Sequence, residues 1–159
     1  MKYSFFAAAL TAAALISCGP KYVEQVSTPG SENAYSMSFI RHVDANLDDD
    51  QNFVISPYSA GVALSMLAEG AEGQTQAEFN AALNQCTFKA EDLGGNDTVI
   101  VKSVNSLWVD DDFSIRNRYV SLLQKDFDAL STTLNFADPS TVQAINNWCS
   151  EHTNGKIKD

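Results

Sequence analysis

Residues 52–75 read NFVISPYSAGVALSMLAEGAEGQT. The apolar segment Phe53-Val54-Ile55 is typical of a short strand and leads directly into a helix start. Ser56 has the side-chain oxygen of a good N-cap, and Pro57 suits the first helical position because a backbone N–H would have no partner there. Residues 51–68 carry no charge, and apolar residues lie on all sides of the predicted helix, so we expect protein to surround it. The helix is too short to span a membrane.

Glycines punctuate the residues that follow. Gly70-Ala71-Glu72-Gly73 predicts the end of the first helix. Thr75 and Glu78 have the spacing of a capping box, in which each side chain accepts the other residue's free backbone N–H, so a second helix is predicted to start there. Residues 86–97 contain Gly94-Gly95 and are predicted to form a loop.

Helical and strand patterns alternate in the rest of the chain. Apolar residues recur at helical spacing in residues 33–47, 119–127 and 139–153, and strand patterns occupy residues 99–109 and 130–136. Asp138-Pro139 is expected to cap the last helix, and Gly155 to end it in the left-handed conformation. The predicted order is helix, strand, two helices, strand, helix, strand, helix. It indicates an α+β domain, part of a larger sheet-and-helix structure whose remaining strands are missing here.

The N-terminus is typical of an exported protein. Lys2 precedes an apolar run at residues 5–16, which is shorter than the roughly 20 residues of a membrane-spanning helix. Leu15-Ile16-Ser17-Cys18 resembles the lipobox of bacterial lipoproteins, which implies removal of residues 1–17 as a signal peptide and acylation of Cys18. An ordinary cleaved leader is the alternative. The lipid would anchor the protein in the bacterial cell envelope, facing the periplasm or the outside.

Two further regions follow from this start. Residues 18–33 contain two prolines, two glycines and no apolar periodicity, so they are predicted to be a tether. Residues 34–159 are predicted to be the folded domain. The two regions would place the fold outside the membrane that holds the lipid.

Charge excludes one class of partner. The chain has 10 basic and 20 acidic residues and a formal net charge of −10. Binding to nucleic acid requires clustered Lys and Arg that displace counterions, whereas Arg116 and Arg118 follow the acidic run Asp110-Asp111-Asp112. No nucleic-acid partner is expected, and a heparin-like polyanion is disfavoured for the same reason.

The cysteines and acidic runs predict no catalytic, metal or cofactor site. Cys86 and Cys149 have no disulfide framework, and we expect two free, mostly buried thiols. Cys149 and His152 have helical spacing but lack the third group of a catalytic or zinc site, so a core cysteine and a helix-end histidine are expected. The acidic runs at residues 48–50 and 110–112 lack the glycine and glutamate of a calcium loop and are predicted to be solvated turns.

Three segments together resemble the serpin family and cover the chain from about residue 33 to its end. Residues 52–75 are similar to the family's strand and second helix. Val104-Asn105-Ser106-Leu107-Trp108 resembles a central-sheet strand that ends in tryptophan. The third segment is similar to the family's helix across that sheet and to the exit of that helix. It comprises Asn135-Phe136, Ala144-Ile145-Asn146-Asn147-Trp148 and Thr153-Asn154-Gly155-Lys156-Ile157. Because the three occur in the family's order and roughly its spacing, the chain is identified as the N-terminal portion of a serpin.

The resemblance implies a fold and a mechanism. The fold is the serpin fold, represented by its N-terminal helices and the first strands of its large central sheet. A serpin inhibits a serine-type endopeptidase, with a cysteine-type one left open, as a suicide substrate: the protease cleaves an exposed loop, which then inserts into the sheet. Such a protein is not an enzyme and needs no catalytic residue or cofactor. Its partners would be the target protease and, through the lipid, a membrane.

The resemblance also implies roles for individual residues. Asn52, Ser56, Pro57 and Ser59 would belong to the shutter region beneath the sheet, where its central strands part. Ser56 has an alternative role as a helix cap only. Asn105 and Trp108 would lie on a central-sheet strand. The helix over the sheet and its exit would contain Ile145, Asn146, Trp148, Thr153, Gly155 and Lys156.

The chain departs from the family pattern in two places. A helix usual in the family between Leu83 and Val99 is replaced by a glycine-containing loop. The chain also stops at Asp159, less than half the usual serpin length, so the reactive loop and the strands that receive it are expected to be missing and these residues alone should not inhibit a protease. Two alternatives remain: a non-inhibitory serpin acting as a surface binding or structural lipoprotein, and an unrelated lipoprotein enzyme.

Overall fold

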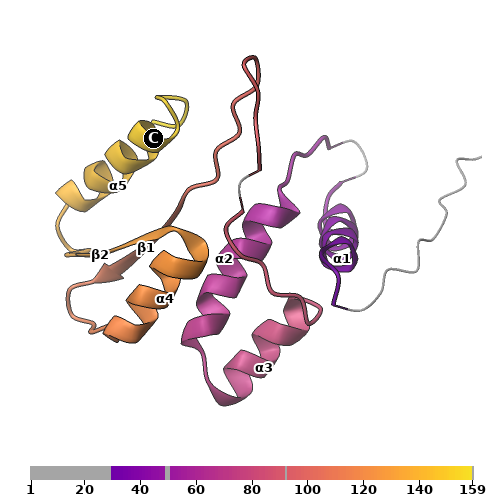
Figure 1. Ribbon diagram of the computed structural model, residues 1–159, viewed down its shortest axis with the longest axis horizontal. Coiled ribbons are helices and arrows are strands. Elements are labelled where there is room, and N and C mark those ends of the chain that lie inside the picture. The colour runs from indigo at the N-terminus through magenta and orange to yellow at the C-terminus, as the bar shows by residue number, and fades with distance from the viewer. Residues whose placement is uncertain (1–29, 49–50, 92, 159) are drawn as a thin grey trace, which may run out of the picture.

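The computed structural model describes residues 30–48, 51–91 and 93–158, so the predicted signal peptide, Cys18 and most of the tether lie outside the described residues. Its elements are α1 (Glu32–Asp44), α2 (Pro57–Gly70), α3 (Gly73–Ala82), β1 (Asn105–Asp110), α4 (Asn117–Phe127), β2 (Ala129–Leu134) and α5 (Ser140–His152). Helix α2 lies in the middle, with α1, α3 and α4 packed around it (Figure 1). The two strands lie beside α4, and α5 lies on their far side from α2 (Figure 1).

The two strands form one parallel pair joined by a helix. β1 pairs with β2 from Asn105 opposite Ala129 to Asp110 opposite Leu134. Parallel strands cannot be joined by a tight turn, and α4 makes the crossover between them. α4 therefore fixes where β2 begins, and the predicted α+β class is confirmed.

The hydrophobic core joins the helices to the start of the strands. Its buried members include Tyr35 of α1, Val62 and Met66 of α2, and Leu123 and Phe127 of α4. Cys86 is also buried and free, and Cys149 is free and half-buried, as the sequence predicted. Burial, followed by the nearby Glu32 carboxylate, raises the pKa of the Cys86 thiol, so this thiol is poorly ionised and unreactive at neutral pH.

One predicted strand is absent from the described structure, and two others have different bounds. Residues 53–55 form no strand within the described structure, and Val54 is fully exposed because no described strand lies beside it. The strand predicted at 99–109 is shortened to Asn105–Asp110, since only an isolated bridge between Gly95 and Ile100 precedes it. β2 likewise occupies Ala129–Leu134 instead of 130–136.

The predicted capping box is also wrong. α3 begins at Gly73, two residues before Thr75, and its N-cap Glu72 makes no capping hydrogen bond through its side chain. Gly73 has a φ of +62°, a conformation that glycine adopts without steric cost and that allows the earlier start. The Glu78 carboxylate accepts a hydrogen bond of 2.8 Å from Gln74 Nε2 on the same helix instead of reaching back to Thr75.

The ends of α5 agree better with the sequence, although the N-cap is Pro139, which has no side-chain capping bond, and the accepting oxygen belongs to Asp138 before it. Asp138 Oδ1 accepts the backbone N–H of Ser140 at 2.8 Å, and this bond lowers the pKa of the Asp138 carboxyl group. At the other end Asn154 and Gly155 both have positive φ, and Gly155 N donates to Ser150 O at 2.7 Å. The described helices include none long and apolar enough to cross a bilayer.

Candidate functional site

The N-terminus of α2 brings three of the four predicted shutter residues together. Ser56 is the N-cap, its Oγ accepts the Ser59 N–H at 3.2 Å, and Pro57 occupies the first turn. The two serine hydroxyl oxygens are 2.9 Å apart and form a second hydrogen bond. Asn52 is exposed and lies outside any helix or strand. The cap is confirmed, while a role in opening the sheet stays a prediction.

A strap formed by residues 86–91 fixes α2 from outside and was not found from the sequence. Phe88 is 1% exposed, and its N–H donates to the buried Ser65 Oγ at 3.1 Å. A Cβ at Gly61 would lie 2.6 Å from the Phe88 ring, so only glycine leaves room for the ring at this position. A glycine inside a charge-free helix was the available signal, because it often marks a close approach of another segment.

Tyr58, two residues after Ser56, holds the other end of the strap. Its hydroxyl donates to Lys89 O at 3.1 Å and accepts the Glu91 N–H at 3.0 Å. Lys89 Nζ also pairs with Asp126 Oδ2 of α4 at 3.1 Å. These bonds explain how the loop that replaces the usual serpin helix is ordered, and the predicted absence of a helix between Leu83 and Val99 is confirmed for the described residues there.

Asn105 joins the start of β1 to the end of α4. Its Nδ2 donates to the carbonyl oxygen of Phe127 at 2.8 Å, one of the carbonyls that an α-helix leaves without an internal partner. Asp128 then takes the left-handed conformation, with φ of +47°, and the chain turns into β2. Asn105 thus fixes the crossover that sets the strand register.

Trp108 and Trp148 connect the strands with α5. Their ring centroids are 5.8 Å apart at an interplanar angle of 84°, an edge-to-face contact. His152 stacks on Trp148 at 4.4 Å, and its Nδ1 is 2.8 Å from Trp148 O. His152 is therefore paired with its own helix.

The exit of α5 is organised by one threonine. Thr153 Oγ1 donates to Cys149 O at 2.7 Å and accepts the Ile157 N–H at 3.0 Å. Lys156 N donates to Thr153 O at 3.1 Å, and Gly155 supplies the left-handed turn between them. Ile145 and Asn146 are half-buried on the helix itself. The predicted exit residues therefore form one local structure.

The acidic run at the end of β1 has a structural role. The Asp110 carboxylate accepts the backbone N–H of Asp112 at 3.0 Å and that of Phe136 at 3.1 Å. These bonds hold the segment after β2 against the end of β1. Asp111 and Asp112 are exposed, as expected of a solvated turn.

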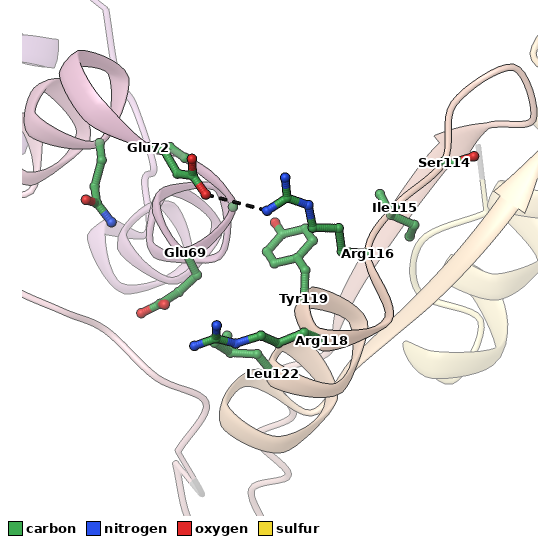
Figure 2. Close-up of a pocket in the computed structure, with 11 residues that line it drawn as sticks. Glu69, Glu72, Ser114, Ile115, Arg116, Arg118, Tyr119 and Leu122 are labelled. Atoms are coloured by element: carbon green, nitrogen blue, oxygen red, sulfur yellow. Dashed lines mark ion pairs between the residues drawn. The ribbon is translucent and has the colours of Figure 1, made fainter.

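A surface cavity of about 670 Å³ lies between the α2–α3 turn and the N-terminus of α4 (Figure 2). Arg116 faces Glu72 across it at 3.6 Å, but both side chains are more than 80% exposed, so the pair contributes at most about 1 kcal/mol. Tyr119 OH donates to Met66 O at 2.8 Å, and burial, then the Glu69 charge, raises the pKa of Tyr119. A Cβ at Gly70 would lie 2.9 Å from the Tyr119 ring. The cavity marks the joint between α2 and α4.

Comparison with known proteins gives the family. The model of the serpin (serine protease inhibitor) family matches residues 31–159. An uncharacterized serpin-like protein of Methanosarcina acetivorans is 27% identical over 149 residues, covering 86% of this chain and 34% of its own length. A serine protease inhibitor of Cyanea capillata is 34% identical over 124 residues, covering 69% of this chain and 33% of its own length.

Solved structures agree. The thermophilic serpin tengpin in its native state superposes with a TM-score of 0.69 at 29% identity, covering 79% of this chain and 34% of that one. The chain belongs to the serpin family, whose members are typically protease inhibitors. It spans about a third of the length of the relatives it matches.

Proposed function

We propose that the full-length protein inhibits a serine-type endopeptidase as a suicide substrate, through insertion of a cleaved loop into its central sheet. The observation that carries the proposal is the light attachment of α5 to the strands. Thr141 is the one buried residue of α5, and the Trp108–Trp148 ring pair is its aromatic contact with β1. A helix held in this way can yield to an entering strand at small cost, because little apolar surface has to be uncovered.

The α2 N-terminus supports the same proposal. Ser56 and Ser59 bond to each other and to the helix backbone, and both are exposed. Hydroxyl groups so placed can exchange these bonds for bonds to strands above them without repacking a core. They would let α2 accept two arrangements of the sheet. Asn52 would join them in the complete protein.

The test of inhibition is formation of a covalent complex. The full-length protein is incubated with trypsin, subtilisin, elastase and papain, and the products are separated in denaturant. We expect a band of serpin plus protease with at least one serine protease. Residues 18–159 alone should give no such band, since the resemblance places the bait loop beyond them. Cleavage of the full-length protein without any stable complex would overturn the inhibitory function and favour a binding or structural serpin.

We also propose that the protein is a lipoprotein of the bacterial cell envelope. The support is Leu15-Ile16-Ser17-Cys18 after a short apolar leader. Mass spectrometry of the native protein should find Cys18 as an acylated N-terminus, and the protein should partition into detergent. The Cys18→Ala variant should stay in the aqueous phase. A mature N-terminus at another residue, or an anchored Cys18→Ala variant, would contradict the proposal.

A further inference from the structure

The strap of residues 86–91 is bonded to two helices at once. On the α2 side, Phe88 is buried and its N–H donates to Ser65 Oγ at 3.1 Å. Two residues further along, the Ala90 N–H donates to the carbonyl oxygen of Asp126 in α4 at 3.1 Å. A few consecutive residues therefore connect α2 with α4.

An ion pair adds a second bond from the strap to the same residue of α4. Lys89 Nζ lies 3.1 Å from Asp126 Oδ2, and the two side chains are 56% and 23% exposed. A pair this open to water contributes little by itself. The attachment of the strap to α4 therefore depends on how well the strap backbone is positioned.

Tyr58 positions that backbone on both sides of Ala90. Its hydroxyl donates to Lys89 O at 3.1 Å and accepts the Glu91 N–H at 3.0 Å. Its ring also lies edge-on to Phe88, with the ring centroids 6.3 Å apart. The two residues bonded to Tyr58 thus flank the residue that bonds α4. One hydroxyl group in the first turn of α2 holds the strap in place for its bond to α4.

This connection matters for a sheet that takes up a further strand. Because α4 makes the crossover between β1 and β2, these three elements form one unit, and α2 lies beside it (Figure 1). A strand that inserts into a sheet widens the sheet by about 4.8 Å. A shift of the β1–α4–β2 unit by that distance relative to α2 breaks the bonds from the strap to Asp126, since a hydrogen bond does not reach so far.

We propose that the strap is a clasp that slows the opening of the sheet, and that Tyr58 is the positioning residue that keeps the clasp closed. The effect on loop insertion rests on the proposed inhibitory function. The bonds of the clasp exist in the closed arrangement and are lost in the open one. Any change that weakens them therefore favours opening and speeds insertion.

The Tyr58→Phe variant of the full-length protein tests the clasp. The change removes both bonds of the hydroxyl group and keeps the ring beside Phe88. We expect the covalent complex with the target protease to form about tenfold faster after loop cleavage, as measured by rapid quenching, because two hydrogen bonds no longer oppose opening. Lys89→Met should act in the same direction with a smaller effect. A merely structural role of Tyr58 predicts lower stability without faster insertion.

Ser31→Ala is the matched control, since it removes the N-cap hydrogen bond of α1, from the Ala34 N–H to Ser31 Oγ. It should lower stability and leave the insertion rate unchanged. Amide hydrogen exchange followed by NMR tests the clasp without a protease. The Ala90 N–H bonds α4 and not Tyr58, so its exchange should become about tenfold faster in Tyr58→Phe only if Tyr58 positions the strap.

The two measurements separate the clasp from the proposed function. If the full-length wild-type protein forms no complex with any protease, the inhibitory function is wrong, and exchange at Ala90 decides whether the clasp exists. An unchanged insertion rate in a folded Tyr58→Phe variant, or unchanged exchange at Ala90, would overturn the clasp.

Discussion

Replacement of Phe88 by alanine is expected to lower the free energy of unfolding of the full-length protein by about 3–5 kcal/mol. Phe88 is 1% exposed, and its ring packs edge-on to Tyr35 at 5.0 Å and to Tyr58 at 6.3 Å. Truncation removes the buried ring and leaves a cavity over Gly61 that the helix cannot fill without moving. Because the strap carries the bonds from Tyr58 and Ser65, its loss should also loosen α2.

Urea unfolding followed by circular dichroism measures this effect. Lys125→Ala is the control, since the Lys125 side chain is charged and 85% exposed and its truncation should change stability by no more than about 0.5 kcal/mol. Gly61→Ala disrupts the same contact from the α2 side. It should lower the free energy of unfolding by about 1–3 kcal/mol, because its Cβ would clash with the Phe88 ring. Equal effects of Phe88→Ala and Lys125→Ala would show that the strap is not part of the core.

Local chemistry explains why the helices could be predicted. Ser56 and Pro57 define the start of α2 whatever surrounds it, because capping and the missing proline N–H act within one turn. The same holds for the exit of α5, where Gly155 takes a conformation that other residues avoid. Features of this kind need only a few consecutive residues. They are therefore visible in the sequence.

Predictions of strands, which need a hydrogen-bonding neighbour from elsewhere in the chain, were wrong or only partly correct. Residues 53–55 have the composition of a strand, but a strand exists only where another chain segment accepts its hydrogen bonds, and the described structure offers none. The ladder of β1 starts at Asn105, where β2 becomes available opposite it. The capping box predicted at Thr75 does not form, because the helix begins at Gly73, two residues earlier. For the two strands, tertiary context overrode a correct local preference, whereas the capping box was overridden by a neighbouring glycine.

The candidate functional residues also divide into those that the sequence predicted and those that depend on the tertiary fold. The Trp108–Trp148 contact agrees with the predicted placing of a helix over the strands. The strap was missed, because Phe88 meets Gly61 only once the chain between them has folded back on α2. Sequence spacing carries no signal for residues that far apart in the chain.

Residues 18–159 expressed alone are expected to associate or to be partly molten. The described structure leaves large apolar side chains in water: Val54 is 100% exposed, Ile100 74%, Val142 63% and Leu67 of α2 48%. Helix α2 was predicted to be surrounded by protein, and here it buries Val62 and Met66 on one face while Leu67 on the other stays open. The parallel pair also has unpaired outer edges within the described residues, and such edges invite pairing with another chain.

The free energy lost by the uncovered side chains decides whether residues 18–159 fold alone. Each uncovered large apolar side chain forgoes about 1.5–3 kcal/mol relative to burial, and a domain has only about 5–15 kcal/mol of stability in total. Two to four such side chains remove the margin, so we expect binding of a hydrophobic dye, oligomers in light scattering and no cooperative transition in calorimetry. The full-length protein, with these surfaces covered as in a complete serpin, should be a monomer with a sharp transition. A monomeric 18–159 chain that unfolds cooperatively would mean that its core suffices alone, and the account of it as one part of a larger serpin sheet would be wrong.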